Sequence, residues 1–169
     1  VEEVTDGVSI EGKVVEYDKV TFNYPNRKEK IFNEASIDIQ KGDKIALIGE
    51  SGIGKSTFIK LIMRFWDANK GTVKLDNKDI KGVNTESIRK TQTLVSQETY
   101  LFDDTIEENI KIGNLNATEE QVIEAAKKAS IHNFIETLPK GYKTKVGELG
   151  GNLSSGEKQR IGLARAFLR

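Results

Sequence analysis

The sequence predicts an α/β fold in which a strand-rich lobe is followed by a helical lobe. Three observations carry this prediction. Short runs of alternating apolar residues, such as Val20–Tyr24 and Ala35–Ile39, dominate the chain up to Gln97. Helix signals replace them afterwards, including a capping-box spacing at Thr118 with an apolar stripe behind it. The third observation is the glycine-rich loop Gly49–Thr57, which has an apolar run before it and an apolar-periodic segment after it.

The predicted organisation has four parts. They are a linker at 1–11, a strand-rich core lobe at 12–99, a helical subdomain at 100–152, and a helix at 153–169 that returns to the core. The last helix stops at Arg169 with no cap and no turn residue, while one of its faces is still apolar. Natural helix ends usually carry such signals, so we expect the chain to be cut at this point.

The strand-rich lobe is built from short segments bounded by turn residues. Pro25 ends one strand, and Lys41–Asp43 forms the turn that leads into the glycine-rich loop. Asn84 or Thr85 can cap a short helix that runs through Arg89. The predicted strands are Val14–Tyr17, Val20–Tyr24, Ala35–Ile39, Ile45–Ile48, Thr72–Leu75 and Thr93–Ser96.

The helical subdomain begins after Gln97, where strand patterning disappears. Asp103 or Asp104 can cap a helix that covers Ile106–Ile110. Further along, Thr118 starts an amphipathic helix, and Ile131–Leu138 reads as one more short helix before a Pro and a Gly.

The loop at 49–57 matches G-x-x-x-x-G-K-[ST], the phosphate-binding P-loop. Its glycines let backbone N–H groups approach phosphate oxygens without an intervening Cβ, and the following helix directs its positive dipole end at the same anion. Lys55 adds a full charge for the β- and γ-phosphates, and the Ser56 hydroxyl is a natural Mg²⁺ ligand. The alternative is a glycine-rich turn that binds nothing. The predicted nucleotide-binding residues are Gly49, Glu50, Ser51, Gly52, Ile53, Gly54, Lys55, Ser56 and Thr57.

The composition excludes several classes of function. Lys plus Arg and Asp plus Glu each number 26, so the formal net charge is zero and no strong positive field is available to hold nucleic acid. The chain has no cysteine, which excludes disulfides, and its one histidine, His132, excludes a His-rich metal site. No apolar run is long enough to span a bilayer, and we expect no signal peptide from the pattern of these residues. We expect the chain itself to be soluble, although its parent could have a membrane part elsewhere.

The order of these motifs resembles the nucleotide-binding domain of an ABC transporter, most closely one of the exporter type. The resemblance covers the chain from about Gly12 to its end. It implies an α/β fold with a P-loop NTPase core, an antiparallel β subdomain and an inserted α-helical subdomain, from which the C-terminal Walker B part is missing. Phe22–Pro25 is similar to the aromatic A-loop, Val95–Glu98 to the Q-loop, and Leu101–Ile110 to the exporter segment that follows the Q-loop. The stretch 143–151 is similar to the loop that exporters carry just before their signature motif.

The segment Leu153–Glu157 resembles that signature motif, L-S-G-G-Q, with departures at Ser155 and Glu157. Ser154 and Glu157 have capping-box spacing, so a helix with small residues at its N-terminus is predicted here. The resemblance implies that this N-terminus and the Ser154 hydroxyl meet the γ-phosphate of ATP held by a second copy. If Glu157 faced the nucleotide, its charge would weaken binding. The alternative is a merely capped helix. The residues assigned to the signature are Leu153, Ser154, Ser155, Gly156 and Glu157.

The resemblance also implies roles for three single residues. Tyr24 would stack on adenine, and Gln97 would touch Mg²⁺, position the attacking water and hinge the two lobes. Glu148 would lie near the coupling helices of a membrane domain. The alternatives are a tyrosine that only packs at a strand end, a solvated amide, and an ordinary exposed carboxylate.

The function implied by the resemblance is an ATPase that powers export across a membrane, with ATP and Mg²⁺ as cofactors. Its implied partners are a transmembrane domain and a second, head-to-tail nucleotide-binding domain, at the cytoplasmic face of the cell membrane, with no nucleic acid. In the family, the Mg²⁺-binding Asp, the catalytic Glu and a phosphate-sensing His follow the signature helix. We therefore expect the general base beyond Arg169, and a chain that binds nucleotide but hydrolyses it slowly. Without the strand that carries these residues, we expect low stability, segment exchange between chains or a distorted helical lobe.

Three other functions remain open from the sequence. A soluble ABC ATPase acting on DNA or ribosomes would share the P-loop and signature, but not the exporter pattern at Thr105–Ile110. A P-loop kinase for a small molecule would have no use for the signature helix. A non-catalytic ATP-binding module would also fit the motifs present.

Overall fold

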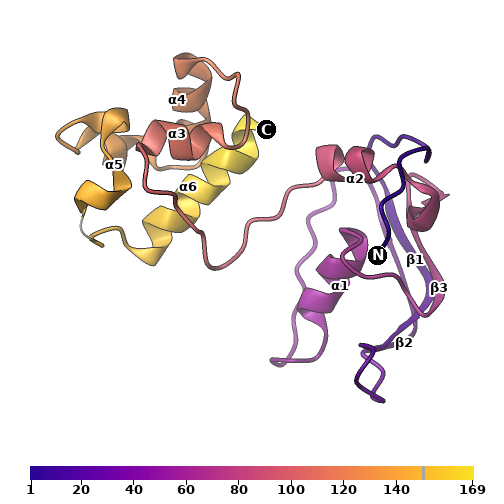
Figure 1. Cartoon of the computed structure of the whole chain (residues 1–169). Coiled ribbons are helices and arrows are strands. Elements are labelled where there is room, and N and C mark those ends of the chain that lie inside the picture. The colour runs from indigo at the N-terminus through magenta and orange to yellow at the C-terminus, as the bar shows by residue number, and fades with distance from the viewer. Residues whose placement is uncertain (150) are drawn as a thin grey trace. The chain divides into compact units, whose positions relative to one another are not determined.

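The computed structural model describes residues 1–149 and 151–169, so that Gly150, part of the predicted exporter loop, lies outside the described residues. Two compact units make up the chain, Val1–Gln92 and Thr93–Arg169 (Figure 1). Their division falls before the expected boundary between residues 99 and 100. The reason is that the stretch 93–99, expected to belong to the core lobe, forms no regular element.

The first unit contains a four-stranded antiparallel sheet. Its order is β2-β1-β3-β4, with β1 at Val15–Phe22, β2 at Phe32–Ile39, β3 at Lys70–Leu75 and β4 at Lys78–Asp79. A single strand, β1, replaces the two strands expected between Val14 and Tyr24. Lys19 has a positive φ of 48° and the pairing register shifts between Tyr17 and Val20. This bulge interrupts the alternation, which is why the sequence pattern reads as two strands.

The helix that follows the P-loop packs on this sheet. Helix α1 spans Lys55–Ile62. Its Phe58 and Leu61 share the core of the first unit with Tyr17 on β1, whose ring lies 4.6 Å from that of Phe58. The Tyr17 hydroxyl also donates a 2.7 Å hydrogen bond to the Phe58 carbonyl, and burial raises the Tyr17 pKa. The sheet therefore fixes the helix that carries the phosphate loop.

Two strands predicted from short apolar runs do not form. Ile45–Ile48 has no regular structure, and Ile48 is 93% exposed. Thr93–Ser96 is also irregular, with Leu94 50% exposed. A strand requires a neighbour for its backbone N–H and C=O groups. Neither segment pairs with another strand within residues 1–149 and 151–169, and most of their apolar side chains are exposed.

The first residues of the chain, expected to be a linker, lie along helix α2 at Thr85–Thr91. Val8 pairs with Val83 in a parallel bridge, just after the 3-10 turn η1 at Ile80–Gly82. The Asp76 carboxylate accepts hydrogen bonds from four consecutive backbone N–H groups at 11–14, at 2.8 to 3.0 Å. On α2, the Thr85 and Ser87 hydroxyl oxygens accept from the Val4 and Ile10 N–H groups at 2.9 and 3.0 Å. These acceptors order a stretch that has no periodic pattern of its own.

The second unit is helical. Its elements are α3 at Ile106–Lys111, α4 at Glu119–Lys128, α5 at His132–Glu136, the 3-10 turns η2 at Gly141–Lys143 and η3 at Val146–Leu149, and α6 at Ser155–Leu168. Their apolar faces form one core, in which Ile106, Val122 and Ile161 are fully buried. The mixed α/β architecture that the sequence predicts, with an antiparallel sheet and a helical part, is confirmed.

Most predicted helix starts are confirmed. Asn84 caps α2, and Thr118 and Gln121 form the expected capping box at α4. The cap of α3 is different from the expected Asp103 or Asp104. Thr105 occupies it, and its hydroxyl accepts from the Glu108 N–H at 3.1 Å. A threonine at this position reaches the third N–H of the helix, as N-cap geometry requires.

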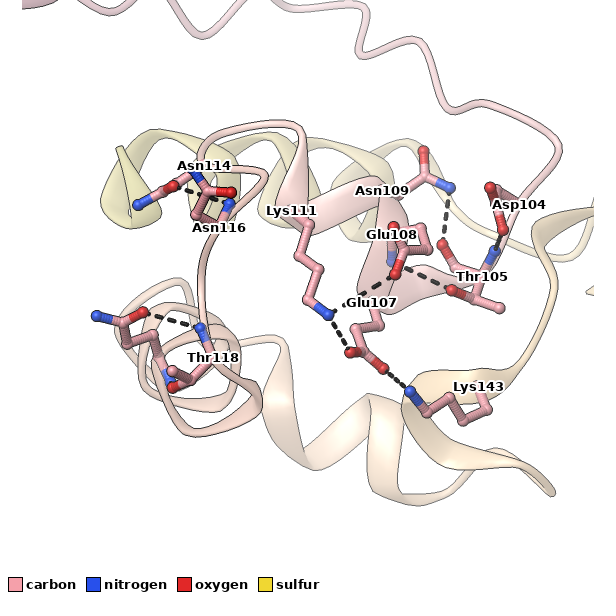
Figure 2. A network of polar contacts seen from close by, with 11 residues as sticks. Asp104, Thr105, Glu107, Glu108, Asn109, Lys111, Asn114, Asn116, Thr118 and Lys143 are labelled. Atoms are coloured by element: carbon pink, nitrogen blue, oxygen red, sulfur yellow. Dashed lines mark hydrogen bonds and ion pairs between the residues drawn. The ribbon is translucent and has the colours of Figure 1, made fainter.

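A buried carboxylate connects α3 to the loop before α6. Glu107 is 3% exposed, and its two oxygens form ion pairs with Lys111, at 2.6 Å, and with Lys143 (Figure 2). Burial alone would raise the pKa of Glu107, but the two ammonium groups hold it below its usual range. The Ile106 N–H donates to the Thr144 carbonyl at 3.0 Å. Together these contacts fix the 143–146 stretch on α3.

Candidate functional site

The predicted P-loop folds into a turn in front of α1. Gly52 and Gly54 have positive φ angles of 86° and 117°, which L side chains rarely adopt. A Cβ on Gly54 would also lie 2.6 Å from Ile31 Cγ2, whereas a Cβ on Gly52 would meet nothing within 4 Å. These two glycines are therefore required by the backbone, and the turn leaves open space beside Gly52.

The N-terminus of α1 differs from that of four other helices. Its N-cap, Gly54, offers no side-chain acceptor, and its first turn holds no acidic residue. Helices α2, α3, α4 and α6 each have a side-chain cap and at least one acidic residue in the first turn. The N–H groups at a helix start need acceptors, and the dipole favours an anion there. Helix α5 at His132–Glu136 shares both absences, but α1 combines them with a glycine-rich loop in front of it and a lysine at its first position, so its start suits an anion from outside the chain.

Lys55 lies over the loop that precedes it. Its ammonium nitrogen donates to the Gly49 and Glu50 carbonyls, each at 2.6 Å. An ammonium has three N–H donors, so this geometry places the charge at the loop while one donor is left for a phosphate oxygen. The predicted charge of Lys55 is thus anchored beside the acid-free start of α1.

The Ser56 hydroxyl is exposed at the same helix start. Within residues 1–149 and 151–169, no group of three or more His, Cys, Asp or Glu side chains is arranged to hold a metal ion. Mg²⁺ usually takes one or two protein oxygens and completes its shell with water and phosphate. A single exposed hydroxyl next to a phosphate loop fits an ion of that kind, which would be shared with the nucleotide.

Tyr24 lies within reach of α1. Its hydroxyl is 3.0 Å from Thr57 Oγ1, and its half-buried ring packs edge-on against Phe22 and Trp66. Thr57 itself is 5% exposed. The structure therefore brings Tyr24 together with the P-loop helix, although 31 positions separate Tyr24 from Lys55 in the sequence.

The signature segment begins α6 as predicted. Ser154 is the N-cap, its hydroxyl accepts from the Glu157 N–H at 3.2 Å, and the Glu157 carboxylate accepts from the Ser154 N–H at 2.7 Å. Leu153 is buried at 6%, while Ser154 and Ser155 are exposed and Gly156 is half-buried. The Glu157 carboxylate is thus hydrogen-bonded to the backbone of its own helix start. The Ser154 hydroxyl keeps its own proton as a donor.

Gln97 and Glu148 both belong to the second unit. Gln97 is exposed in the irregular stretch after Ser96. Glu148 is exposed in η3 and accepts hydrogen bonds from Lys140 at 2.9 and 3.1 Å, which lowers the Glu148 pKa. Tyr24 and the P-loop lie together in the first unit, whereas Gln97 and the signature belong to the second.

Two residues that shape these sites have no motif in the sequence. Trp66 contacts Tyr24, and Glu107 pairs with a lysine 36 positions later. The only signal for Trp66 is its aromatic type just after the P-loop helix. Nothing in the spacing of the charged residues separates Glu107 from the exposed Glu108 beside it.

Comparison with known proteins agrees with this geometry. The family model described as ABC transporter matches residues 32–169. Across residues 1–149 and 151–169, no helix combines the length and apolar character needed to cross a bilayer.

Three relatives illustrate this match, each named as an ABC transporter or ABC exporter. A Haemophilus influenzae protein named "Probable ABC transporter ATP-binding/permease protein" is 49% identical over 91% of this chain and 28% of its own length. The Dictyostelium discoideum ABC transporter B family member 2 is 50% identical over 98% of this chain and 12% of its own length. A solved bacterial Atm1-family ABC exporter with ATP bound has a TM-score of 0.90 and 39% identity, over 99% of this chain and 30% of that chain. This chain thus spans less than a third of each of these three relatives.

Proposed function

Because the chain belongs to the ABC transporter family, we propose that it is the ATP-binding and ATP-hydrolysing motor domain of an exporter. The observation that carries the proposal is the start of α1, where a glycine N-cap, an acid-free first turn and the anchored Lys55 ammonium converge. The relative solved with ATP bound supports the choice of nucleotide.

In this proposal the first unit holds the nucleotide. The loop at 49–57 and the N–H groups of α1 bind the phosphates, and Lys55 neutralises charge on the β- and γ-phosphates. Mg²⁺, held by Ser56 and phosphate oxygens with Gln97 as a further ligand, would neutralise more of that charge. Tyr24 stacks on the adenine. Phosphoryl transfer to water requires positioning and charge neutralisation more than covalent chemistry.

The signature segment of the second unit serves the ATP of another copy. Its exposed Ser154 sits at the start of a 14-residue helix, where N–H groups and the dipole favour a phosphate. The Glu157 carboxylate accepts from the Ser154 N–H, which supports a capping role for this residue in place of a direct contact with the phosphate. Two domains would close head to tail with one ATP between each P-loop and the partner's signature helix.

The partner of this domain is a membrane domain of the same or another chain, and the domain would lie at the cytoplasmic face of the membrane. The names of the relatives, which combine ATP-binding with permease parts or state a transporter, support this partner. They offer no support for the alternative of a soluble ABC protein acting on DNA or ribosomes. We keep the division into a core lobe, a helical subdomain at 100–152 and a returning signature helix as part of the proposal.

Hydrolysis needs a water molecule positioned for attack on the γ-phosphate. We propose that Gln97 positions this water. The check is a phosphate-release assay on Gln97→Ala beside the unaltered chain. Equal turnover would contradict this role of Gln97.

The decisive experiment for the function is calorimetry with MgATP on the Lys55→Ala variant. We expect ATP affinity to fall about 10- to 100-fold, since a charge-assisted contact to the phosphates is lost. The matched control is Lys60→Ala, which changes an exposed lysine of the same helix and should bind ATP like the unaltered chain. Equal affinity of Lys55→Ala and the unaltered chain would overturn the proposal.

A further inference from the structure

Three aromatic rings form a cluster beside the P-loop helix. The ring centroids of Tyr24 and Trp66 are 5.3 Å apart at an interplanar angle of 89°, and those of Phe22 and Tyr24 are 5.1 Å apart at 79°. Phe22 and Trp66 also contact each other at 6.3 Å. Edge-to-face pairs at these distances are attractive beyond the area they bury. Phe22 is 2% exposed, so the cluster is rooted in the core of the first unit.

The end of α1 places Trp66 in this cluster. The Phe65 N–H bonds the Lys60 carbonyl at 2.8 Å and the Arg64 N–H bonds the Leu61 carbonyl at 3.1 Å. These are the two hydrogen bonds of a Schellman motif, and Arg64 has the left-handed φ of 53° that the motif requires. After this turn Phe65 is 52% exposed, whereas Trp66 is half-buried against Tyr24. The way in which α1 ends thus places Trp66, and not Phe65, against Tyr24.

The Tyr24 side chain is restrained at both ends. Its hydroxyl bonds to Thr57 in the first turn of α1, and its ring contacts Trp66, which follows the last turn. One short helix therefore carries the phosphate loop at its start, the hydroxyl partner of Tyr24 in its first turn, and the ring partner of Tyr24 after its end. The position of this aromatic ring relative to the phosphate loop is set by α1.

We propose that Trp66 is a positioning residue for the nucleobase, acting by holding the ring of Tyr24 in place before the nucleotide binds. This inference rests on the proposed function, in which Tyr24 stacks on adenine. A ring that is already ordered does not have to lose rotamer freedom when the base arrives, so more of the stacking energy appears as affinity. Removing Trp66 weakens binding of ligands with a base and leaves the phosphate loop as it is.

The experiment compares MgATP with magnesium tripolyphosphate, which has the phosphate chain and no base. Calorimetry is performed on the unaltered chain, on Trp66→Leu, on Trp66→Phe and on the control Phe65→Leu, which removes the exposed aromatic ring next to it. We expect Trp66→Leu to lower ATP affinity about 3- to 10-fold, the range of one aromatic pair, and to leave tripolyphosphate affinity unchanged. Trp66→Phe should restore most of the ATP affinity, and Phe65→Leu should bind both ligands normally.

A second measurement needs no variant. Trp66 is the only tryptophan of the chain, so its emission reports on the ring cluster. MgATP should change this emission and magnesium tripolyphosphate should not.

Several results would overturn the inference. Equal losses of ATP and tripolyphosphate affinity in Trp66→Leu would mean a purely structural role. An ATP affinity of Trp66→Leu equal to that of Phe65→Leu would show that Trp66 does not act on the base. An emission change that is the same for both ligands would show the same. If the unaltered chain binds neither ligand, the proposed function fails and this inference fails with it. If the unaltered chain binds both ligands and the Trp66 variants bind them as well as Phe65→Leu does, the proposed function stands and the positioning role of Trp66 is lost.

Discussion

Replacement of Glu107 by Gln tests the buried ion pairs of the second unit. The substitution keeps the shape of the side chain and removes its charge. Glu107 is 3% exposed, while the Lys111 side chain is 20% exposed and the Lys143 side chain 65% exposed. Because both lysines reach solvent, they can regain hydration when the carboxylate is lost. The destabilisation should therefore stay below the full penalty for breaking a buried pair.

The magnitude follows from these exposures. A hydrogen bond to a charged group contributes about 1.5–3 kcal/mol when it is buried, and an exposed pair contributes much less. Only the contact with Lys111 is substantially shielded, so we expect Glu107→Gln to lower the free energy of unfolding by about 2 kcal/mol. Glu108→Gln is the matched control on the same helix. Its carboxylate is 51% exposed and lies 3.7 Å from Lys111, so no measurable change is expected.

The assay is urea unfolding followed by far-ultraviolet circular dichroism, with hydrogen exchange read on peptides from 103–111 and 143–149. Burial would raise the pKa of Glu107, but its lysine partners hold the folded value below the ordinary 4.5. The stabilisation is thus present above about pH 4.5 and is lost as pH falls through the folded pKa. The difference between Glu107→Gln and the unaltered chain should shrink over that range. Equal stability at pH 7, or a difference that persists in acid, would refute the reasoning.

Two further predictions concern Asp76 and Ser154. Asp76→Asn should cost about 1–2 kcal/mol and speed hydrogen exchange at 1–14, since four backbone N–H groups lose a charged acceptor. Burial opposes ionisation of Asp76, yet these bonds keep its pKa below 3.8, so the effect should fade as pH drops below about 4; unchanged exchange would contradict it. Ser154→Ala should cost about 1 kcal/mol in thermal unfolding and weaken ATP-dependent pairing of two copies in ultracentrifugation, whereas Ser155→Ala should leave the stability of α6 intact.

Local signals in the sequence predicted the local structure well. The capping boxes at Thr118 and Ser154 form as expected, because their hydrogen bonds join residues three positions apart. The P-loop turn is also local, and its positive φ angles fall on Gly52 and Gly54. The prediction of a strand at Ile45–Ile48 was wrong. A strand depends on a neighbour elsewhere in the chain, and no strand pairs with this segment among the described residues.

Contacts between residues far apart in the chain could not be predicted from the sequence patterns. The pairing of Glu107 with Lys143 and the contact of Trp66 with Tyr24 depend on where turns direct the chain. The Schellman turn that places Trp66 has Arg64 where glycine is the usual signal, so the sequence gives no warning of it. The roles of the site residues rest on family membership, because the P-loop alone does not distinguish one nucleotide-dependent function from another.

The ordered start of the chain matters to anyone who shortens this protein. Strand patterning begins at Gly12, which makes that residue a tempting place to cut. Such a cut would remove the bridge between Val8 and Val83 and one of the N–H donors to the Asp76 carboxylate. It would also remove Ile10, which is 9% exposed and bonds to Ser87, and so uncover part of α2. Versions that begin at Gly12 should aggregate more readily and be harder to purify than those that begin at Val1.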